Sequence, residues 1–326
     1  MKIRALALIS GGLDSLLAAK LIVDQGCEVI GLHFKIPFCK INIQESFPKI
    51  GIKIMEVDLG AEFLQLIQDP RYGFGSNMNP CIDCKILMFS RAKELMPELG
   101  AKFIITGEVL GQRPMSQNKQ ALKLIRFRSG LEDLLLRPLS AQFFPPSLAE
   151  REGWVKREKL LNFNGRMRTP QMRLARDLGL NVYATPAGGC LLTDPGFSRR
   201  LVELLAHDEL NLENLELLKV GRHFRLGANT RLVVGRDQRE NNQLAQLAQA
   251  GDYLFSPQND LAGPTCLARG LINPELISLS SQITSAYTDG ASSGEMEVLY
   301  RQVPSDQDKV HQVSCLPKDR FAHLFI

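Results

Sequence analysis

Short apolar runs, each ended by a turn, recur along the first hundred residues. Residues 3–9 read IRALALI, 28–34 read EVIGLHF, and 52–59 read IKIMEVDL. Runs of this length are typical of strands that are buried on both faces of a parallel sheet. The segment KFIITGE, 102–108, predicts a further strand of the same kind.

Apolar positions with helical spacing lie between these runs. A stripe predicts a helix at about 14–25, and its members are Leu16, Leu17, Leu21 and Ile22. A stronger amphipathic pattern predicts a helix over 82–99, and AEFLQLIQ predicts a short one. Strands that alternate with helices predict an α/β fold, with a parallel sheet covered by helices on both faces.

The pattern changes near residues 195–220, where TDPGFSRRLVELLAHDELNLENLELLKVG reads as a connecting helical stretch. Beyond it, short strand candidates such as TRLVVGR are separated by glycine and proline turns. We therefore predict two domains, one over residues 1–197 and a smaller α+β domain over residues 198–326.

The composition is that of an ordinary globular protein. The chain has 326 residues, of which 44% are hydrophobic and 23% are charged. No apolar run approaches the ~18–20 residues that a membrane helix needs. The N-terminal ALALI is too short for the apolar part of a signal peptide. We expect a cytoplasmic protein without membrane contact.

The formal net charge is +4, from 39 Lys and Arg against 35 Asp and Glu. Basic residues gather in REGWVKREK (151–159) and RMRTPQMRLAR (166–176), and in a later set, Arg222, Arg225, Arg231, Arg236 and Arg239. Such clusters are either solvated helix faces or contacts to a polyanion such as RNA, and the sequence leaves both open.

The string SGGLDS, residues 10–15, joins the first strand to the first helix. Gly11 and Gly12 let the backbone turn tightly and bring its N–H groups close to a ligand. The helix start adds unpaired N–H donors and a partial positive charge, so the turn suits a phosphate. The alternative is an ordinary strand–helix turn in which Asp14 caps the helix.

SGGLDS resembles the SGGxDS signature of the PP-loop ATP pyrophosphatases. This resemblance implies that ATP is cut between its α and β phosphates and that AMP is attached to a substrate oxygen. It also implies that Ser10, Gly11, Gly12 and Ser15 hold the pyrophosphate. Asp14 would lie beside the phosphates and their Mg²⁺.

Seven cysteines in a cytoplasmic chain favour metal or redox chemistry over a disulfide framework. Cys81 and Cys84 form a CxxC pair in NPCIDCK, at the start of the predicted 82–99 helix. A helix N-terminus lowers thiol pKa values. The pair is a redox dithiol, half of a metal site, or two buried thiols.

Cys190 is a third candidate, because Gly188 and Gly189 let the backbone present its sulfur. Three thiolate ligands leave an open coordination position, and on a [4Fe-4S] cluster they leave one iron free for an exogenous sulfur. Zinc with a distant fourth ligand is an alternative. The remaining cysteines are expected to be small buried hydrophobes; they are Cys27, Cys39, Cys266 and Cys315.

Two further segments sharpen the resemblance. TGEVLGQ (106–112) and LLLRPLS (134–140) are similar to segments of the tRNA 4-thiouridine synthetases. The CxxC helix start resembles the tRNA thiolation enzymes that hold a [4Fe-4S] cluster on three cysteines. Over about residues 1–195, the resemblance implies that Cys81, Cys84 and Cys190 ligate the cluster and act in catalysis, and that Gly107 lies at the nucleotide site.

Those synthetases carry an RNA-binding THUMP region ahead of the PP-loop and a rhodanese-like sulfur carrier, and neither is seen here. The stretch LLKVGRHFRL…TRLVVGRDQRENNQL resembles the RNA-binding domain of the NFACT proteins. That resemblance implies an RNA-binding module in the C-terminal part of the chain.

These observations predict a tRNA sulfurtransferase that adenylates a uridine carbonyl oxygen and replaces it with sulfur, giving 4-thiouridine. Its partners would be tRNA and a sulfur donor, either sulfide or a persulfide carrier. One alternative is an ATP-dependent enzyme that forms amide or C–N bonds on a small molecule; another is a non-catalytic RNA-binding protein. A third keeps thiolation but replaces the cluster with a persulfide–disulfide cycle of Cys190 with Cys81 or Cys84.

Overall fold

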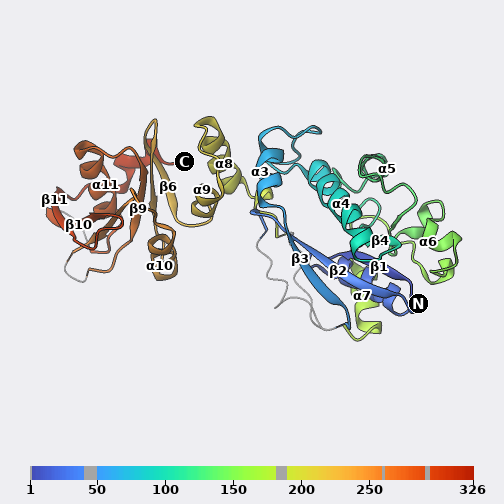
Figure 1. Cartoon of the computed structure of the whole chain (residues 1–326). Coiled ribbons are helices and arrows are strands. Elements are labelled where there is room, and N and C mark those ends of the chain that lie inside the picture. Colours follow the sequence, from blue (N-terminus) through green and yellow to red (C-terminus); the bar gives the residue numbers. More distant parts are fainter. Residues whose placement is uncertain (1, 40–49, 181–188, 259–260, 291–293) are drawn as a thin grey trace. The chain divides into compact units, whose positions relative to one another are not determined.

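The chain folds into two units, Met1–Thr193 and Asp194–Ile326. The computed structural model describes residues 2–39, 50–180, 189–258, 261–290 and 294–326 (Figure 1). The boundary between the units lies four residues before the one predicted from the sequence. The helical stretch near residue 200 belongs to the second unit, where its Glu203 pairs with Arg225.

A five-stranded parallel sheet forms the centre of the first unit, in the order β3-β2-β1-β4-β5. Its strands are β1 (Arg4–Leu8), β2 (Glu28–Lys35), β3 (Lys53–Asp58), β4 (Phe103–Thr106) and β5 (Leu135–Leu136). The four predicted strands are confirmed, with β4 shorter than expected. The two-residue β5 was not predicted, because so short a pairing leaves no periodic signal.

Helices cover both faces of this sheet, as the alternation predicted. They are α1 (Leu13–Val23), α3 (Gly60–Gln68), α4 (Cys81–Glu98), α5 (Lys119–Arg128), α6 (Leu148–Arg151) and α7 (Thr169–Asp177). Ala5 and Ala7 of β1 pack with Ile22 of α1 on one face. Leu6 packs with Phe89 of α4 on the other. The alternating side chains of a central strand thus fill two apolar layers.

The second unit has a six-stranded antiparallel sheet, in the order β11-β10-β8-β9-β7-β6. Its strands are β6 (Arg222–Gly227), β7 (Thr230–Val234), β8 (Tyr253–Pro257), β9 (Cys266–Gly270), β10 (Glu295–Gln302) and β11 (Lys309–Ser314). Its helices are α8 (Pro195–Ala206), α9 (Leu212–Leu217), α10 (Gln238–Leu247) and α11 (Pro274–Ala286). Ile283 of α11 packs on one face and Leu244 of α10 on the other, which confirms the predicted small α+β domain.

Within the part of the chain that the structure describes, no helix combines the length and the apolar character needed to cross a bilayer.

Candidate active site

The loop between β1 and α1 is held by its own two serines. The Ser15 hydroxyl donates to the Gly12 carbonyl at 2.8 Å and accepts from the Ser10 N–H at 3.3 Å. Gly11 has φ of 73°, a left-handed conformation that glycine adopts without strain. Gly12 is the N-cap of α1 and makes no side-chain cap. The first N–H groups of the helix therefore remain free of a capping side chain, as an anion site at a helix start requires.

Asp14 lies inside the first turn of α1 and does not cap it, so the alternative based on an Asp cap is wrong. Its Oδ2 accepts from the Gln112 amide at 3.0 Å, while its buried Oδ1 has no partner. Burial raises the pKa of Asp14, and the Gln112 hydrogen bond and the charges of Arg168 and Arg113 lower it by less. A partnerless buried carboxylate oxygen beside a phosphate-type loop fits a divalent cation.

Gly107 lies directly against the start of α1. A Cβ at this position would come within 2.4 Å of the Asp14 carbonyl carbon and 2.5 Å of the Ser15 nitrogen. Only glycine allows the end of β4 to approach the loop so closely. Close packing against α1 thus explains why residue 107 is glycine. Its contact with a nucleotide stays a prediction.

A buried charge network connects the three motifs of the first unit. Glu108 of TGEVLGQ pairs with Lys85 of NPCIDCK at 2.7 Å and with Arg137 of LLLRPLS at 2.8 Å. Burial alone raises the pKa of Glu108, but the Lys85 ammonium and the Arg137 guanidinium outweigh it and bring the pKa below its usual range. The network ties the start of α4, and with it the CxxC pair, to the end of β4.

Replacing Glu108 by alanine is expected to destabilise the protein by about 3–5 kcal/mol, because it leaves two buried cations without their counter-ion. Urea unfolding of the full chain at pH 7 measures this. The stability that Glu108 contributes is present above its unfolded pKa of about 4.3 and is lost as the pH falls through its lower folded pKa. The wild-type chain should therefore lose more stability than the variant upon acidification.

Glu98→Ala is the matched control, because Glu98 is exposed at the end of the same helix. It should change the unfolding free energy by less than about 0.5 kcal/mol. Equal effects of the two substitutions would contradict the role given to the network.

Cysteines from three separate segments meet beside this network. Cys81 and Cys84 occupy the first turn of α4, as predicted. Asn77 Nδ2, just before that turn, donates to the Thr193 carbonyl at 2.9 Å, which holds the loop after Cys190. The Leu191 N–H donates to the Phe38 carbonyl at 2.8 Å, and Cys39 pairs with Cys190 in an antiparallel bridge.

The thiols lie close enough to influence one another electrostatically. Burial raises the pKa of Cys84 far above its usual value, and the thiols of Cys190, Cys81 and Cys39 raise it further. Burial also raises the pKa of Cys190 to about 11, against the lowering effect of the Leu192 N–H. The expectation that the helix start lowers the pKa of its thiols is therefore wrong for Cys84, because burial outweighs the helix dipole.

The expected inert role of Cys39 does not fit its position, since it is partly exposed and faces Cys190. Cys27 and Cys266 are buried, as predicted, whereas Cys315 is partly exposed. The sequence held a signal for Cys39, which follows the carboxyl end of β2 by four residues. That edge of a parallel sheet is where ligands bind. Gly188, also expected to shape this region, lies outside the described residues.

The thiols supply the donor type that an iron–sulfur cluster or zinc requires. Among the described residues, however, no three His, Cys, Asp or Glu side chains have the mutual positions of a metal site. Thiols are suitable ligands for a cluster. In this structure, however, the described thiols do not have the relative positions that binding one metal ion or cluster requires.

Arg113 connects the thiols to the phosphate-type loop. Its guanidinium lowers the pKa of Asp14 on one side and that of Cys190 on the other. Arg113 is exposed and directly follows the motif that contains Gln112. The charge of Arg113 therefore acts on both the loop carboxylate and the Cys190 thiol. The sequence analysis assigned no role to Arg113, Gln112, Lys85 or Glu108, because only the folded chain brings them together.

Several arginines of the second unit are engaged inside it. Arg225 pairs with Glu203 and Glu209, and Arg236 pairs with Glu240. Each of these guanidinium groups has a carboxylate partner in its own unit. The basic cluster that suggested RNA contact thus offers fewer open cations than its sequence implied.

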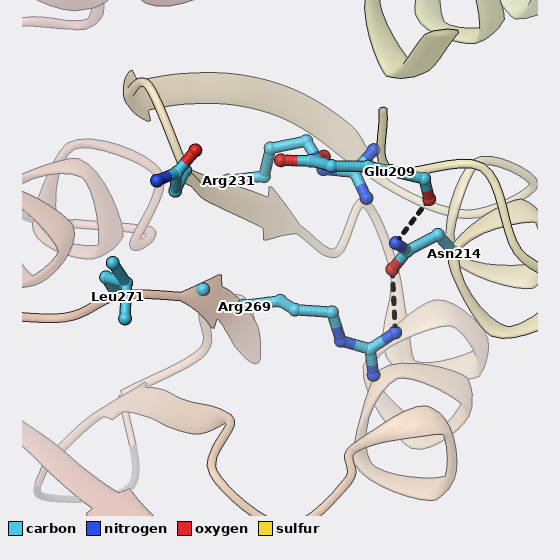
Figure 2. A pocket seen from close by; sticks show the side chains of 7 residues that line it. Glu209, Asn214, Arg231, Arg269 and Leu271 are labelled. Atoms are coloured by element: carbon cyan, nitrogen blue, oxygen red, sulfur yellow. Dashed lines mark hydrogen bonds and ion pairs between the residues drawn. The ribbon is translucent and has the colours of Figure 1, made fainter. Parts of the chain in front are cut away.

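A cavity of about 320 Å³ lies in this unit. Figure 2 shows Arg231 and Arg269, which line it from β7 and β9. Arg231 pairs with Glu209 at 3.1 Å, and Arg269 pairs with Asp252 at 2.7 Å. Asn214 accepts from Arg269 at 3.1 Å and donates to the Glu209 carbonyl at 2.7 Å. These pairs make the cavity part of the internal framework of the unit, although Nη1 of Arg231 has no hydrogen-bond partner.

Two family models match the chain. Residues 1–142 match the family described as thiamine biosynthesis protein (ThiI). Residues 221–326 match the NFACT protein RNA binding domain. Residues 1–142 thus resemble a ThiI domain, and residues 221–326 resemble an NFACT RNA-binding domain. The ThiI-like range contains the phosphate-type loop, the CxxC pair and the charge network, and Cys190 lies beyond it.

Curated relatives match parts of the chain that differ in length. A probable tRNA sulfurtransferase of Methanothermobacter thermautotrophicus is 31% identical over 42% of this chain and 36% of its own length. The tRNA-specific 2-thiouridylase MnmA of Marinobacter nauticus is 26% identical over 76% of this chain and 64% of its own. The chain spans about a third of the length of the tRNA sulfurtransferases it matches.

Solved structures give weaker matches. A 4-thiouridine synthetase–RNA complex with bound ATP is 20% identical, with a TM-score of 0.34 over 65% of this chain and 52% of its own. The C-terminal part of a fibronectin/fibrinogen-binding protein from Streptococcus suis is 12% identical, with a TM-score of 0.30 over 48% of this chain and 77% of its own.

Proposed function

We propose that this chain is an ATP-dependent tRNA sulfurtransferase that makes 4-thiouridine. The observation that carries the proposal is the presence, in one unit, of an anion-type loop with a partnerless carboxylate oxygen and a group of converging thiols. The charge of Arg113 acts on both Asp14 and Cys190. The names of the curated relatives, a probable tRNA sulfurtransferase and a tRNA-specific 2-thiouridylase, support tRNA thiolation without fixing which oxygen is replaced.

The first step uses the loop. A uridine carbonyl oxygen attacks the α-phosphorus of ATP, and pyrophosphate leaves. Ser10, Gly11, Gly12 and Ser15 would hold the pyrophosphate through backbone N–H groups and hydroxyls. These groups are fixed before the substrate binds by the Ser10–Ser15 contacts, so they stabilise the developing charge without rearrangement.

Asp14 would hold Mg²⁺ through its partnerless Oδ1 while Gln112 fixes its Oδ2. The cation, when bound, neutralises charge on the phosphates and favours departure of pyrophosphate. Arg113 and Arg168, the two cations that act on Asp14, are placed to attract the polyphosphate chain.

The second step uses the thiols. A sulfur nucleophile attacks the activated carbon and AMP leaves with the former carbonyl oxygen. The site excludes much of the water around Cys84 and brings the sulfur close to the activated base, so proximity supplies part of the rate. Lys85 and Glu108 fix the turn of α4 that presents the CxxC pair.

We propose that Cys81, Cys84 and Cys190 hold a [4Fe-4S] cluster. When bound, its open iron would carry the exogenous sulfur. A persulfide–disulfide cycle without a cluster is the second candidate, and a specific observation favours it: Cys190 has a thiol partner in Cys39 across a backbone bridge. Iron and sulfide analysis of protein purified without oxygen decides between the two.

The NFACT-type domain would bind the tRNA, as its family description suggests. Arg199 and Arg239 are exposed, and the ion pairs found among the described residues do not include them. Such open arginines suit phosphate contacts, which position the RNA without reading its sequence.

Replacing both Arg199 and Arg239 by glutamate is expected to weaken tRNA binding and to reduce the salt slope of log K by about 2, one for each lost phosphate contact. Filter binding at salt concentrations from about 50 to 300 mM measures this slope. A control variant, Arg91→Glu with Lys102→Glu, changes the charge equally on exposed positions of the first unit. An unchanged slope in the Arg199/Arg239 variant would refute these contacts.

The proposed activity as a whole is tested by a reconstituted reaction with the full chain, ATP, Mg²⁺, unmodified tRNA and sulfide. Formation of AMP and pyrophosphate should depend on the tRNA. Turnover with a small amine or carboxylate in place of tRNA would favour the amide-forming alternative instead.

A further inference from the structure

Cys39 and Cys190 face each other across an antiparallel pair. The Leu191 N–H bonds to the Phe38 carbonyl at 2.8 Å, so the neighbouring positions 38 and 191 carry the hydrogen bond. Cys39 and Cys190 are therefore a non-hydrogen-bonded pair of the antiparallel bridge. In such pairs the two Cα atoms are typically only about 4.5 Å apart. The two side chains emerge on the same face of the pair.

This arrangement suits a disulfide. Natural disulfides join residues whose Cα atoms are about 4.4–6.8 Å apart and whose Cβ atoms are about 3.5–4.5 Å apart. Cys81 and Cys84 are three residues apart at a helix start, where regular helical Cβ atoms are about 5–6 Å apart, so a disulfide between them requires the first turn to change shape. Both Cys39 and Cys190 are free thiols in this structure and both are partly exposed, so the pair is open to reaction.

We propose that Cys39 is a fourth thiol of the active site and resolves a persulfide on Cys190, forming a Cys39–Cys190 disulfide as the sulfur leaves. The inference rests on the second candidate of the proposed function, the persulfide–disulfide cycle without a cluster, and replaces Cys81 and Cys84 as the disulfide partners of Cys190. It follows from the backbone bridge, which sets these two side chains opposite each other.

The chemistry balances within the site. The Cys39 sulfur attacks the inner sulfur of the Cys190 persulfide, and a new S–S bond forms between the two residues. The old S–S bond breaks, and its electron pair leaves with the outer sulfur as sulfide. The Cys39 thiol proton passes to that sulfide, which becomes the nucleophile for the activated uridine. An external dithiol then reduces the disulfide and restores both thiols.

The experiment uses the reduced full chain, loaded with sodium polysulfide and freed of excess reagent. Released sulfide is measured over time, and the remaining thiols are then blocked with N-ethylmaleimide for peptide mass spectrometry without reductant. We expect one equivalent of sulfide and a cross-linked peptide pair that contains Cys39 and Cys190. Addition of dithiothreitol should remove the cross-link.

Cys39→Ser should keep the persulfide on Cys190 and release sulfide at least tenfold more slowly. Dithiothreitol should restore release in this variant, because an external thiol replaces the missing one, whereas a purely structural defect would not respond. Cys39→Ala serves as a second variant if the serine form is unstable. Cys315→Ser, a partly exposed cysteine of the other unit, should behave as the wild type.

The proposal is overturned by a Cys190 disulfide to Cys81 or Cys84, by wild-type sulfide release from Cys39→Ser, or by the absence of a persulfide on Cys190. The proposed function is tested separately by AMP and pyrophosphate formation with tRNA. If the cross-link forms but tRNA never stimulates ATP cleavage, the Cys39 inference stands and the assigned substrate fails.

Discussion

Asp14→Asn is expected to lower tRNA-dependent pyrophosphate release by roughly 10²–10³-fold, the loss typical for removal of one preorganised charge contact. The asparagine keeps the shape of the side chain and its contact with Gln112, but it removes the negative charge that faces the phosphate-type loop. Because the partnerless Oδ1 makes no internal bond, the fold should be preserved. Radiolabelled ATP with unmodified tRNA gives the rate.

Asp24→Asn is the matched control at the other end of the same helix, where Asp24 is an exposed partner of Lys20. It should leave the rate within about twofold, as expected for a surface ion pair. If Asp14→Asn releases pyrophosphate at the wild-type rate, the assignment of this loop to ATP is wrong.

Cys190→Ser is expected to remove thiolated product, with a decrease of at least ~10³-fold, while pyrophosphate release stays within about threefold of the wild type. The reason is that, in the proposed mechanism, the thiols act after adenylation, on the sulfur, whereas Asp14 acts on the phosphates. The two activities should therefore separate: Asp14 variants lose both and Cys190 variants lose one.

The separation is read by measuring AMP and thiolated nucleoside in the same reaction, with Cys315→Ser as the control. Thiolation by Cys190→Ser at a normal rate would remove this cysteine from the mechanism. Loss of both activities, with the fold intact by circular dichroism, would show that the thiols and the loop do not act in sequence.

Periodicity predicted the parallel sheet well, because a buried strand must be apolar along its length. The CxxC pair and SGGLDS could also be placed from sequence, since each lies where a strand or turn passes into a helix. In contrast, β5 has only two residues, and its pairing depends on β4 beside it. No local pattern marks such an element.

The site was predicted in part. The positions of Asp14, Cys81 and Cys84 at helix starts followed from local signals. Cys39 differs from Cys27 in following the carboxyl end of a strand, but nothing in the sequence shows that the chain brings it opposite Cys190. The pairing between Glu108 and its two cations likewise joins residues 23 and 29 positions apart.

Charge was the least reliable guide. Arg225, Arg231 and Arg236 suggested a basic surface, yet each has a carboxylate partner in the fold. Formal charge counted along a sequence does not show which cations are already paired. The evidence for RNA contact now comes from the NFACT family match and from the exposed Arg199 and Arg239.

The most direct test of the central claim is nucleoside mass spectrometry of bulk tRNA from a strain that lacks this gene, compared with its parent. The account predicts that 4-thiouridine is lost, that the wild-type gene restores it, and that genes carrying Asp14→Asn or Cys190→Ser do not. Unchanged amounts of thiolated nucleosides in the deletion strain would contradict the account. Selective loss of 2-thiouridine would show that the enzyme adds sulfur at another position of the base.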